Sequence, residues 1–382
     1  MRDELKRRNE ALRADVAAIV RLSADAKIVS DLEPYRSALL KNAANLLQKI
    51  EKNLLNLSVG QENLLSDILS ETSTLIQWTR LYKFRFLRPL HRASEWDRVC
   101  LKTLFWLHNQ HPDTKRFPPV FADDDISIIP SIQLIPFYFF PCLEQRTLLF
   151  QPLFFHEFGH LLYQCHRREL DDLVGDFQQT VEGSLLPGSQ RNDQYSLTQM
   201  RIRQSIVEAW YSWTQEFFCD AVGLAIGGPC FLQTFSNYIA KYQTADFYRQ
   251  PSNLNGSTHP VSWLRIQILV DRARQRGYRH AAEAVFGQWQ QTAELLRVTE
   301  DYHGFYTDSL KTALVKTLDD MLVEVSPREC TSEEANAVAW QDRDEDLIGL
   351  LNRAWLEFVE NPSQFSDWER QVFKDRYQLQ IT

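Results

Sequence analysis

The sequence lacks the cysteine pattern and the long hydrophobic runs that mark several large classes of protein. Its 382 residues include six cysteines, with no C-x-x-C pair and without the density of a disulfide-rich secreted scaffold. The most apolar stretch, 126–141, is interrupted by three prolines, so it is too short and too broken to cross a bilayer as a helix. No apolar segment typical of a signal peptide begins the chain. We therefore expect a soluble cytoplasmic protein with no membrane span.

An excess of positive charge is also missing. Lys and Arg number 42 against 50 Asp and Glu, which gives a formal net charge of −8. A surface for nucleic acid or for an anionic membrane needs basic charge, so neither is an expected partner. The N-terminus is locally basic, but acids interleave with its arginines and lysine, as on a solvated helix face.

Helical periodicity dominates the rest of the chain and predicts a mainly α protein with a small α+β part. Apolar stripes predict an N-terminal helical region over 1–115. Residues 116–276 form the predicted catalytic core, and 277–382 a C-terminal helical region. Within the core, 126–140 is rich in Ile, Phe and Tyr with prolines spaced through it, which suits the edge strands of a small sheet.

Two helices of the core are expected to carry the chemistry. Residues 153–166 have helical periodicity, with Pro152 in the first turn, where proline is tolerated. Residues 197–225 form a longer helical pattern that Gly-Gly-Pro at 227–229 ends. A third helix is expected to begin at Pro260.

The first of these helices contains H-E-x-x-H. His156 and His160 are four residues apart, so both imidazoles project from one face and can bind a single ion. Glu157 lies beside that face, where it can contact a water on the metal. In this arrangement the histidines bind zinc and the glutamate acts as a base. The alternative is a pair of core histidines, because the flanking residues are those of any buried helix.

A catalytic zinc site needs a third protein ligand and a free position for water. Glu216, in an aromatic run of the second helix, is the candidate. Asp220 follows on the same face and can accept a hydrogen bond from the second nitrogen of a ligand histidine. Unpaired carboxylates are costly among aromatic side chains, which favours these roles. The alternative is an amphipathic helix whose two acids face water.

H-E-x-x-H followed by E-x-x-x-D on a later helix resembles the gluzincin metallopeptidases. The run from Ser257 to Pro260, with Arg265 six residues after His259, resembles a narrower group, the family of the CAAX prenyl endopeptidases and the bacterial heat-shock membrane protease. The resemblance covers about 120–275 and implies a zincin-like core. It also implies an edge strand in 126–140 that receives the substrate as an added strand. Unlike the membrane members of that family, the chain has no expected transmembrane helix and adds long helical flanks.

The resemblance assigns a role to each candidate residue. It implies that the zinc ligands are His156, His160 and Glu216, that Glu157 is the general base and that Asp220 supports a ligand. It implies further that His259 donates to the substrate oxyanion and that Arg265 braces the site. For His259, a polar cap before Pro260 is the alternative. The implied activity is zinc-dependent hydrolysis of peptide bonds in a protein or peptide substrate.

A binding protein is the rival hypothesis. In that case a helical adaptor uses zinc only to link two helices, without catalysis. The N-terminal helical region is the candidate surface for a regulatory protein partner. An apolar stripe in 37–57 resembles a coiled-coil seam, but breaks come before several heptads accumulate, so burial within the chain is the expected use.

Overall fold

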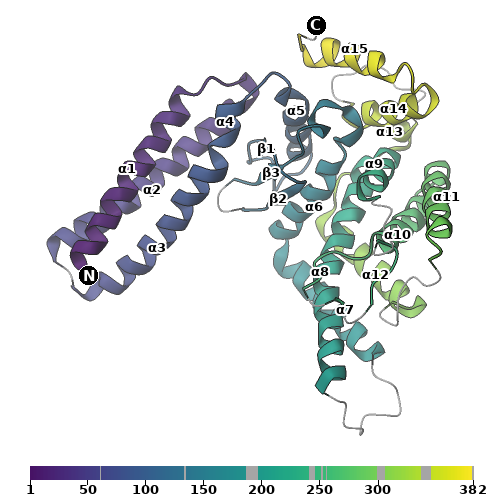
Figure 1. Cartoon of the computed structure of the whole chain (residues 1–382), viewed down its shortest axis with the longest axis horizontal. Coiled ribbons are helices and arrows are strands. Elements are labelled where there is room, and N and C mark those ends of the chain that lie inside the picture. The colour runs from purple at the N-terminus through teal and green to yellow at the C-terminus, as the bar shows by residue number, and fades with distance from the viewer. Residues whose placement is uncertain are drawn as a thin grey trace. The chain divides into compact units, whose positions relative to one another are not determined.

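The computed structural model describes residues 1–60, 62–132, 135–185, 197–240, 246–250, 253–254, 256–298, 306–336 and 346–380. It is mainly helical and contains a small three-stranded sheet, which confirms the mainly α fold expected from the sequence (Figure 1). A zincin-like identity for the core stays a prediction. None of the helices in these ranges combines the length and apolar character needed to cross a membrane.

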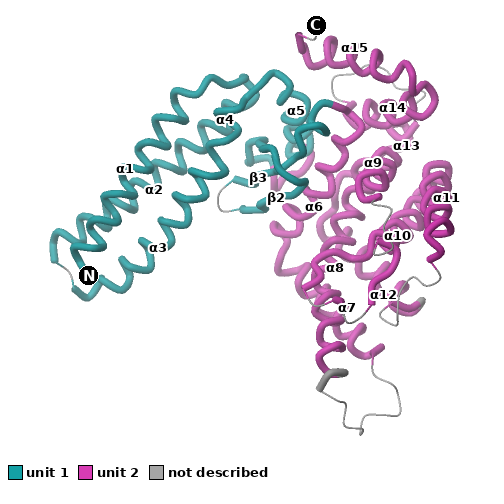
Figure 2. The backbone as a smooth tube through the Cα atoms, in the orientation of Figure 1, with its two compact units in different colours: residues 1–109, 115–146 teal, residues 110–114, 147–382 magenta. Residues whose placement is uncertain are grey.

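The chain divides into two compact units (Figure 2). Unit 1 comprises residues 1–109 and 115–146, and unit 2 comprises 110–114 and 147–382. The strands therefore belong with the N-terminal helices, and the expected C-terminal boundary at 276 lies inside unit 2. The division into three functional regions stays a prediction.

Unit 1 begins with three long helices, α1 (Arg2–Asp25), α2 (Glu33–Val59) and α3 (Leu65–Leu81), and α1 packs against both of the others (Figure 1). The inner face of α2 supplies Leu39 and Ile50, which are both fully buried. Most of the apolar stripe in 37–57 therefore packs within the unit, as expected, whereas Leu55 is 62% exposed.

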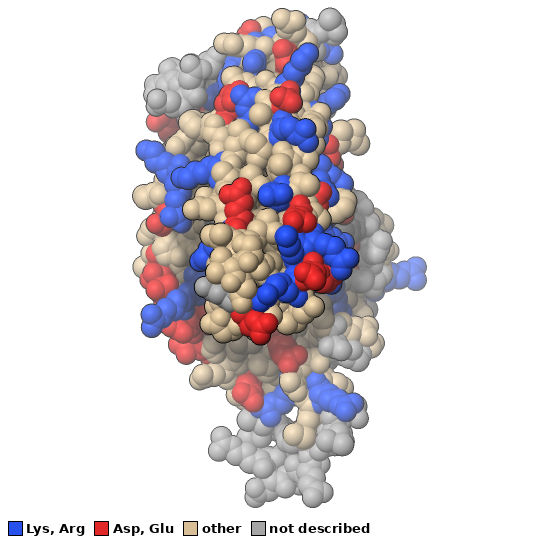
Figure 3. Space-filling view, turned by 90° about the vertical axis from the view of Figure 1, so that its left-hand side faces the viewer, with Lys and Arg blue, Asp and Glu red and all other residues tan. Residues whose placement is uncertain are grey.

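Charges of both signs are mixed on the face that Figure 3 presents. On α1, Arg7 and Arg8 pair with Glu4 at 2.8 and 2.9 Å. Lys83 pairs with Asp15 at 2.9 Å. These pairs are exposed and contribute little to stability, because water and salt screen them. The basic residues of the N-terminus are interleaved with acids, as the sequence predicted.

The remainder of unit 1 contains α4 (Arg88–Arg92), α5 (Asp97–Asn109) and the sheet. The strands are β1 (Phe121–Ala122), β2 (Ser127–Ile129) and β3 (Phe137–Phe139), in the order β1-β3-β2. β3 is parallel to β1 and antiparallel to β2, with Tyr138 opposite both Phe121 and Ile128. Of the two strands in the segment 126–140, β2 is an edge strand as expected, but β3 is central. The prolines lie outside the strands, so β3 can bond on both sides.

Unit 2 is helical, with the long α8 (Leu197–Gly227) at its centre (Figure 1). The helices that pack against α8 are α6 (Leu153–Cys165), α7 (Arg167–Ser184), α9 (Pro229–Ile239), α10 (Ser262–Gln275), α12 (Asp308–Val325) and α14 (Leu347–Glu360). The other helices are α11 (Arg279–Leu295), α13 (Ser332–Ala335) and α15 (Phe365–Tyr377). The three helices expected to position the site, α6, α8 and α10, end within two residues of their predicted bounds.

Candidate metal centre

Three predicted ligands converge between α6 and α8. The ligand atoms of His156, His160 and Glu216 all lie within 4.8 Å of one another. His156 Nε2 is 3.5 Å from Oε2 of Glu216, and His160 Nε2 is 3.4 Å from its Oε1. The two imidazole planes are almost perpendicular, at 88°. The helix spacing of the histidines therefore places them as H-E-x-x-H predicts, and α8 brings Glu216 to the same point.

Gly159 explains how the two helices come close enough for this. A Cβ atom added at Gly159 would lie 2.7 Å from Cα of Cys219, closer than real Cβ atoms approach other atoms. Glu216 precedes Cys219 by about one helical turn, so it lies opposite the histidines at this close approach. Gly159 occupies one of the two variable positions of the motif, and no local pattern in the sequence announces its contact with α8.

The candidate site residues differ in how far their side chains are exposed to solvent. Glu216 and Asp220 are 6% and 1% exposed, which contradicts the alternative in which both acids face water. His156 and Glu157 are also buried. The His259 side chain, in contrast, is 62% exposed.

The buried acids are held by Arg265, which α10 supplies. Its Nε and Nη2 donate to the two carboxylate oxygens of Asp220, both at 2.7 Å. Asp220 Oδ1 also lies 2.9 Å from Nδ1 of His156. Arg265 Nη2 is in addition 3.2 Å from Oε2 of Glu216. A two-pronged pair of this kind compensates buried charge and fixes the orientation of both partners.

The protonation of the histidines differs sharply. Burial lowers the pKa of His160, to about 4. Burial also disfavours charge on His156, but contacts with Asp220 and Glu216 outweigh it and raise its pKa to about 10. Burial would raise the pKa of Glu216, but His156 and Arg265 hold it well below its usual range. A ligand imidazole must be neutral, so a metal ion would displace the proton of His156.

The donor set fits zinc. Zinc binds imidazole nitrogen and carboxylate oxygen at about 2.0–2.2 Å in a tetrahedron, which puts neighbouring donors about 3.3 Å apart. The separations of 3.5 Å to Oε2 and 3.4 Å to Oε1 of Glu216 are close to that value, and the three donor atoms together lie within 4.8 Å. Oε2 of Glu216 is buried, and none of the described residues donates it a hydrogen bond of good geometry. That oxygen therefore has a lone pair available for a cation.

Glu157 lies beside the triad without a fixed partner. Its carboxyl group forms no hydrogen bond or ion pair within the described part of the chain, whereas Asp220 forms several. Burial, together with the negative charge of Glu216, raises the pKa of Glu157 to about 7, although His156 opposes the shift. A carboxyl group of this pKa exchanges protons readily near neutral pH.

His259 is the most exposed of the candidate site residues and lies on a loop that hydrogen bonds hold in place. Its Nε2 is 3.7 Å from Oε2 of Glu216, and its Nδ1 is 2.8 Å from Oγ1 of Thr258. Arg249 donates to Oγ of Ser257 at 2.5 Å and to the carbonyl of His259 at 3.3 Å. Trp213 Nε1 also donates to Ser257, at 3.3 Å.

Sequence reasoning missed two of the residues that shape the site. Arg249 lies in a polar loop with no motif of its own. Phe235, on α9, covers Arg265 with its ring at 4.6 Å and stands 5.7 Å from the ring of His156. Phe235 is 3% exposed, so it forms an apolar wall over the His156–Asp220–Arg265 group. Neither contact has a signal in the sequence, because each joins elements that are distant along the chain.

No protein-family model matches the chain, and comparison with curated proteins and with solved structures finds no similar protein. The resemblance to the gluzincins thus rests on the motif residues alone.

Proposed function

We propose that this protein is a zinc-dependent endopeptidase acting on a protein substrate, with zinc held by His156, His160 and Glu216. The observation that carries the proposal is the convergence of three donor atoms within 4.8 Å, next to a buried glutamate with no fixed partner. Zinc bound there would polarise the scissile carbonyl and lower the pKa of an attacking water. Side chains of the protein would transfer the proton, position the zinc ligands and stabilise the oxyanion.

Glu157 is the proposed proton carrier. A pKa of about 7 lets the carboxylate accept a proton from the attacking water and lets the resulting acid give it to the leaving amine. The proton therefore moves from water to the amine nitrogen through one side chain, while the C–N bond breaks. The lack of a competing hydrogen-bond partner leaves the carboxyl group free for both transfers.

Asp220 and Arg265 are proposed to hold the ligands in place. Asp220 Oδ1 lies 2.9 Å from Nδ1 of His156, and accepting a proton there would leave the Nε2 lone pair directed toward the other donors. Arg265 fixes Asp220 at two points and offsets the charge of Glu216. A shift of either acid would change the spacing of the donor atoms.

His259 is the proposed oxyanion donor. Its ring is exposed and its Nε2 lies 3.7 Å from Oε2 of Glu216, and its loop is held by hydrogen bonds of Arg249, Ser257 and Thr258. Losing one such donor typically lowers the rate about 100- to 1000-fold.

The first experiment compares metal content and cleavage in three forms of the full chain: wild type, Glu157→Gln and Glu216→Gln. We expect zinc in the wild type and in Glu157→Gln, and a much lower zinc content in Glu216→Gln, measured by plasma mass spectrometry. New protein termini in a proteome exposed to the enzyme should appear with wild type only. Glu169→Gln, which removes an exposed acid of unit 2, is the matched control and should behave as wild type.

The outcomes separate catalysis from a structural metal. Zinc in both wild type and Glu157→Gln, with no cleavage by either, would favour the zinc-linked adaptor. Full cleavage by Glu157→Gln would exclude the proposed proton carrier. Wild-type protein that takes up no zinc would refute the metal assignment itself.

A further inference from the structure

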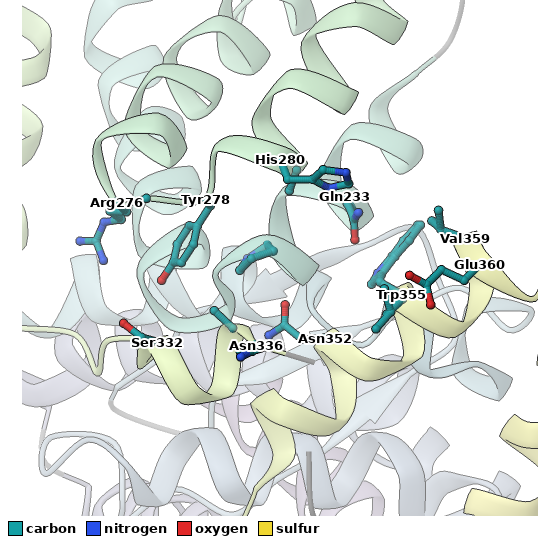
Figure 4. Close-up of a pocket in the computed structure, with 15 residues that line it drawn as sticks. Gln233, Arg276, Tyr278, His280, Ser332, Asn336, Asn352, Trp355, Val359 and Glu360 are labelled. Atoms are coloured by element: carbon teal, nitrogen blue, oxygen red, sulfur yellow. The ribbon is translucent and has the colours of Figure 1, made fainter. Parts of the chain in front are cut away.

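Unit 2 contains a pocket that shares no residue with the candidate metal centre. It is a pocket of about 520 Å3 between α9, the turn from α10 to α11, α13 and α14 (Figure 4). Small-molecule sites commonly have volumes of about 300–1000 Å3. Four segments far apart in the sequence meet here, so the pocket belongs to the folded unit and not to one local loop.

At one end of the pocket two of the hydrogen-bond donors already have partners within the chain. Figure 4 shows Arg276, Tyr278 and Ser332 together at this end. Arg276 Nη2 donates to Glu329 at 2.9 Å, and the Tyr278 hydroxyl donates to the carbonyl of Cys330 at 3.3 Å. An anionic ligand would have to displace these internal partners. The arrangement therefore disfavours an anion.

The opposite end has acceptor groups that the described part of the protein does not use. Figure 4 groups Gln233, His280, Trp355 and Glu360 there. The side chains of Gln233, His280 and Glu360 make no hydrogen bond or ion pair with described residues. The Glu360 carboxylate is therefore an unpaired negative charge at the rim, beside an aromatic ring.

The end of α14 adds to this negative character. Glu360 is the last residue of the helix, and its last turn contains no basic residue. Carbonyl groups at a helix C-terminus carry a partial negative charge, and a cation near them is normally favourable. A glutamate at this position opposes that preference and adds a negative charge where the last turn supplies no basic residue.

Aromatic and aliphatic surfaces line the same end. The Trp355 ring is fixed because its Nε1 donates to the carbonyl of Leu149 at 3.2 Å and to Thr234 Oγ1 at 2.8 Å. Leu356 and Val359 provide aliphatic walls, and Val359 is 60% exposed. Trp355 is 4% exposed, so only a small part of its ring is open to the pocket, where contact with an indole ring favours a cation. Aliphatic walls suit the methylene groups of the chain that carries it.

We propose that this pocket binds a primary amine or guanidinium at the end of an aliphatic chain. Glu360 would pair with the cation, Gln233 would accept a hydrogen bond from it, and Trp355 would contact its charge. This chemistry belongs to free alkyl diamines and to lysine or arginine side chains of a polypeptide. The site stands independently of the peptidase function.

The test is isothermal titration calorimetry on the full chain at low salt. One probe is cadaverine, and the other is an end-capped pentapeptide with one central lysine. The same peptide with acetylated lysine is the neutral control. We expect the cationic probes to bind and Glu360→Gln to raise their Kd about fivefold, the size typical of an exposed ion pair. Glu169→Gln, which removes the same charge elsewhere in unit 2, should leave the Kd unchanged.

The pattern of binding identifies the source of the ligand. Binding of cadaverine alone supports a free amine, and binding of the lysine peptide supports a basic side chain. Equal binding by wild type and Glu360→Gln would overturn the proposal, including the case in which an amine coordinates a metal at the triad. Equal affinity for the acetylated peptide, or no binding of either cationic probe, would overturn it as well.

Discussion

Replacing Gly159 with alanine tests the contact that brings the two ligand helices together. The added Cβ would lie 2.7 Å from Cα of Cys219, 3.0 Å from its Cβ and 3.1 Å from its Sγ. Carbon atoms in contact are normally about 3.5–4.0 Å apart. Because the nearest atom belongs to the backbone, no side-chain rotation relieves the clash. The helices α6 and α8 must therefore separate by about 1 Å.

This separation affects the metal centre more than the stability. Overpacking of this kind typically costs about 1–3 kcal/mol, and the higher helix propensity of alanine returns up to about 1 kcal/mol. The net loss of unfolding free energy is then about 0–3 kcal/mol. Moving Glu216 by about 1 Å would carry its oxygens beyond the 3.4–3.5 Å that separate them from the histidine nitrogens. We therefore expect zinc affinity to fall at least about tenfold, as for the loss of a residue that orients a ligand.

The assay is competition with a fluorescent zinc chelator, combined with urea unfolding. Gly175→Ala is the control, because a Cβ at that position of α7 meets no atom within 4 Å. The control should retain zinc and gain up to about 1 kcal/mol from helix propensity. If Gly159→Ala bound zinc as tightly as Gly175→Ala and were equally stable, the close approach would not control the site.

Three further predictions concern other parts of unit 2. Burial raises the pKa of Glu369 to about 7, and the unfolded value is about 4.5. The folded state thus holds this proton more tightly, so stability falls as pH rises from about 4.5 through 7, by at most about 3 kcal/mol. Glu369→Gln keeps an acceptor for Leu148 N–H and should remove this fall in stability. The measurement is the urea midpoint of each protein between about pH 4.5 and 7. An equal dependence of the midpoint on pH in both proteins would contradict the prediction. Arg249→Ala should release the His259 loop and lower kcat/KM about 10- to 100-fold while zinc content stays constant, with partial recovery in Arg249→Lys; a parallel loss of zinc would show a general structural defect instead. Asp220→Asn should weaken zinc binding about 10- to 100-fold in the chelator competition, and unchanged affinity would exclude its role in orienting His156.

Local patterns in the sequence predicted the parts of the site that depend on one helix. The four-residue spacings of His156 with His160 and of Glu216 with Asp220 each follow from helix geometry. The bounds of α6, α8 and α10 also follow from local signals, namely Pro152, the Gly-Gly-Pro at 227–229 and Pro260. These predictions required no knowledge of how the helices pack.

Local sequence patterns do not predict contacts between elements that are distant along the chain. The central place of β3 depends on its pairing with β1 and β2, although prolines near it suggested an edge. Phe235 reads as an ordinary core residue until α9 is placed over Arg265. The anchoring of the His259 loop by Arg249 likewise depends on a loop-to-loop contact. In each case the decisive partner lies elsewhere in the chain, and one sequence contains no signal for it.

The charges of the buried cluster can be balanced both without a metal ion and with the proposed dication. With Glu216 and Asp220 ionised and Arg265 positive, one negative charge remains, and the proton on His156 balances it. A zinc ion that displaced this proton would leave one surplus positive charge, which ionised Glu157 would balance. Both states of the buried cluster are then close to neutral, as burial requires. Two core histidines on an apolar helix would need none of these acids. The proposed metal ion and proton transfer would account for a buried glutamate with no fixed partner among the described residues, which packing alone does not require.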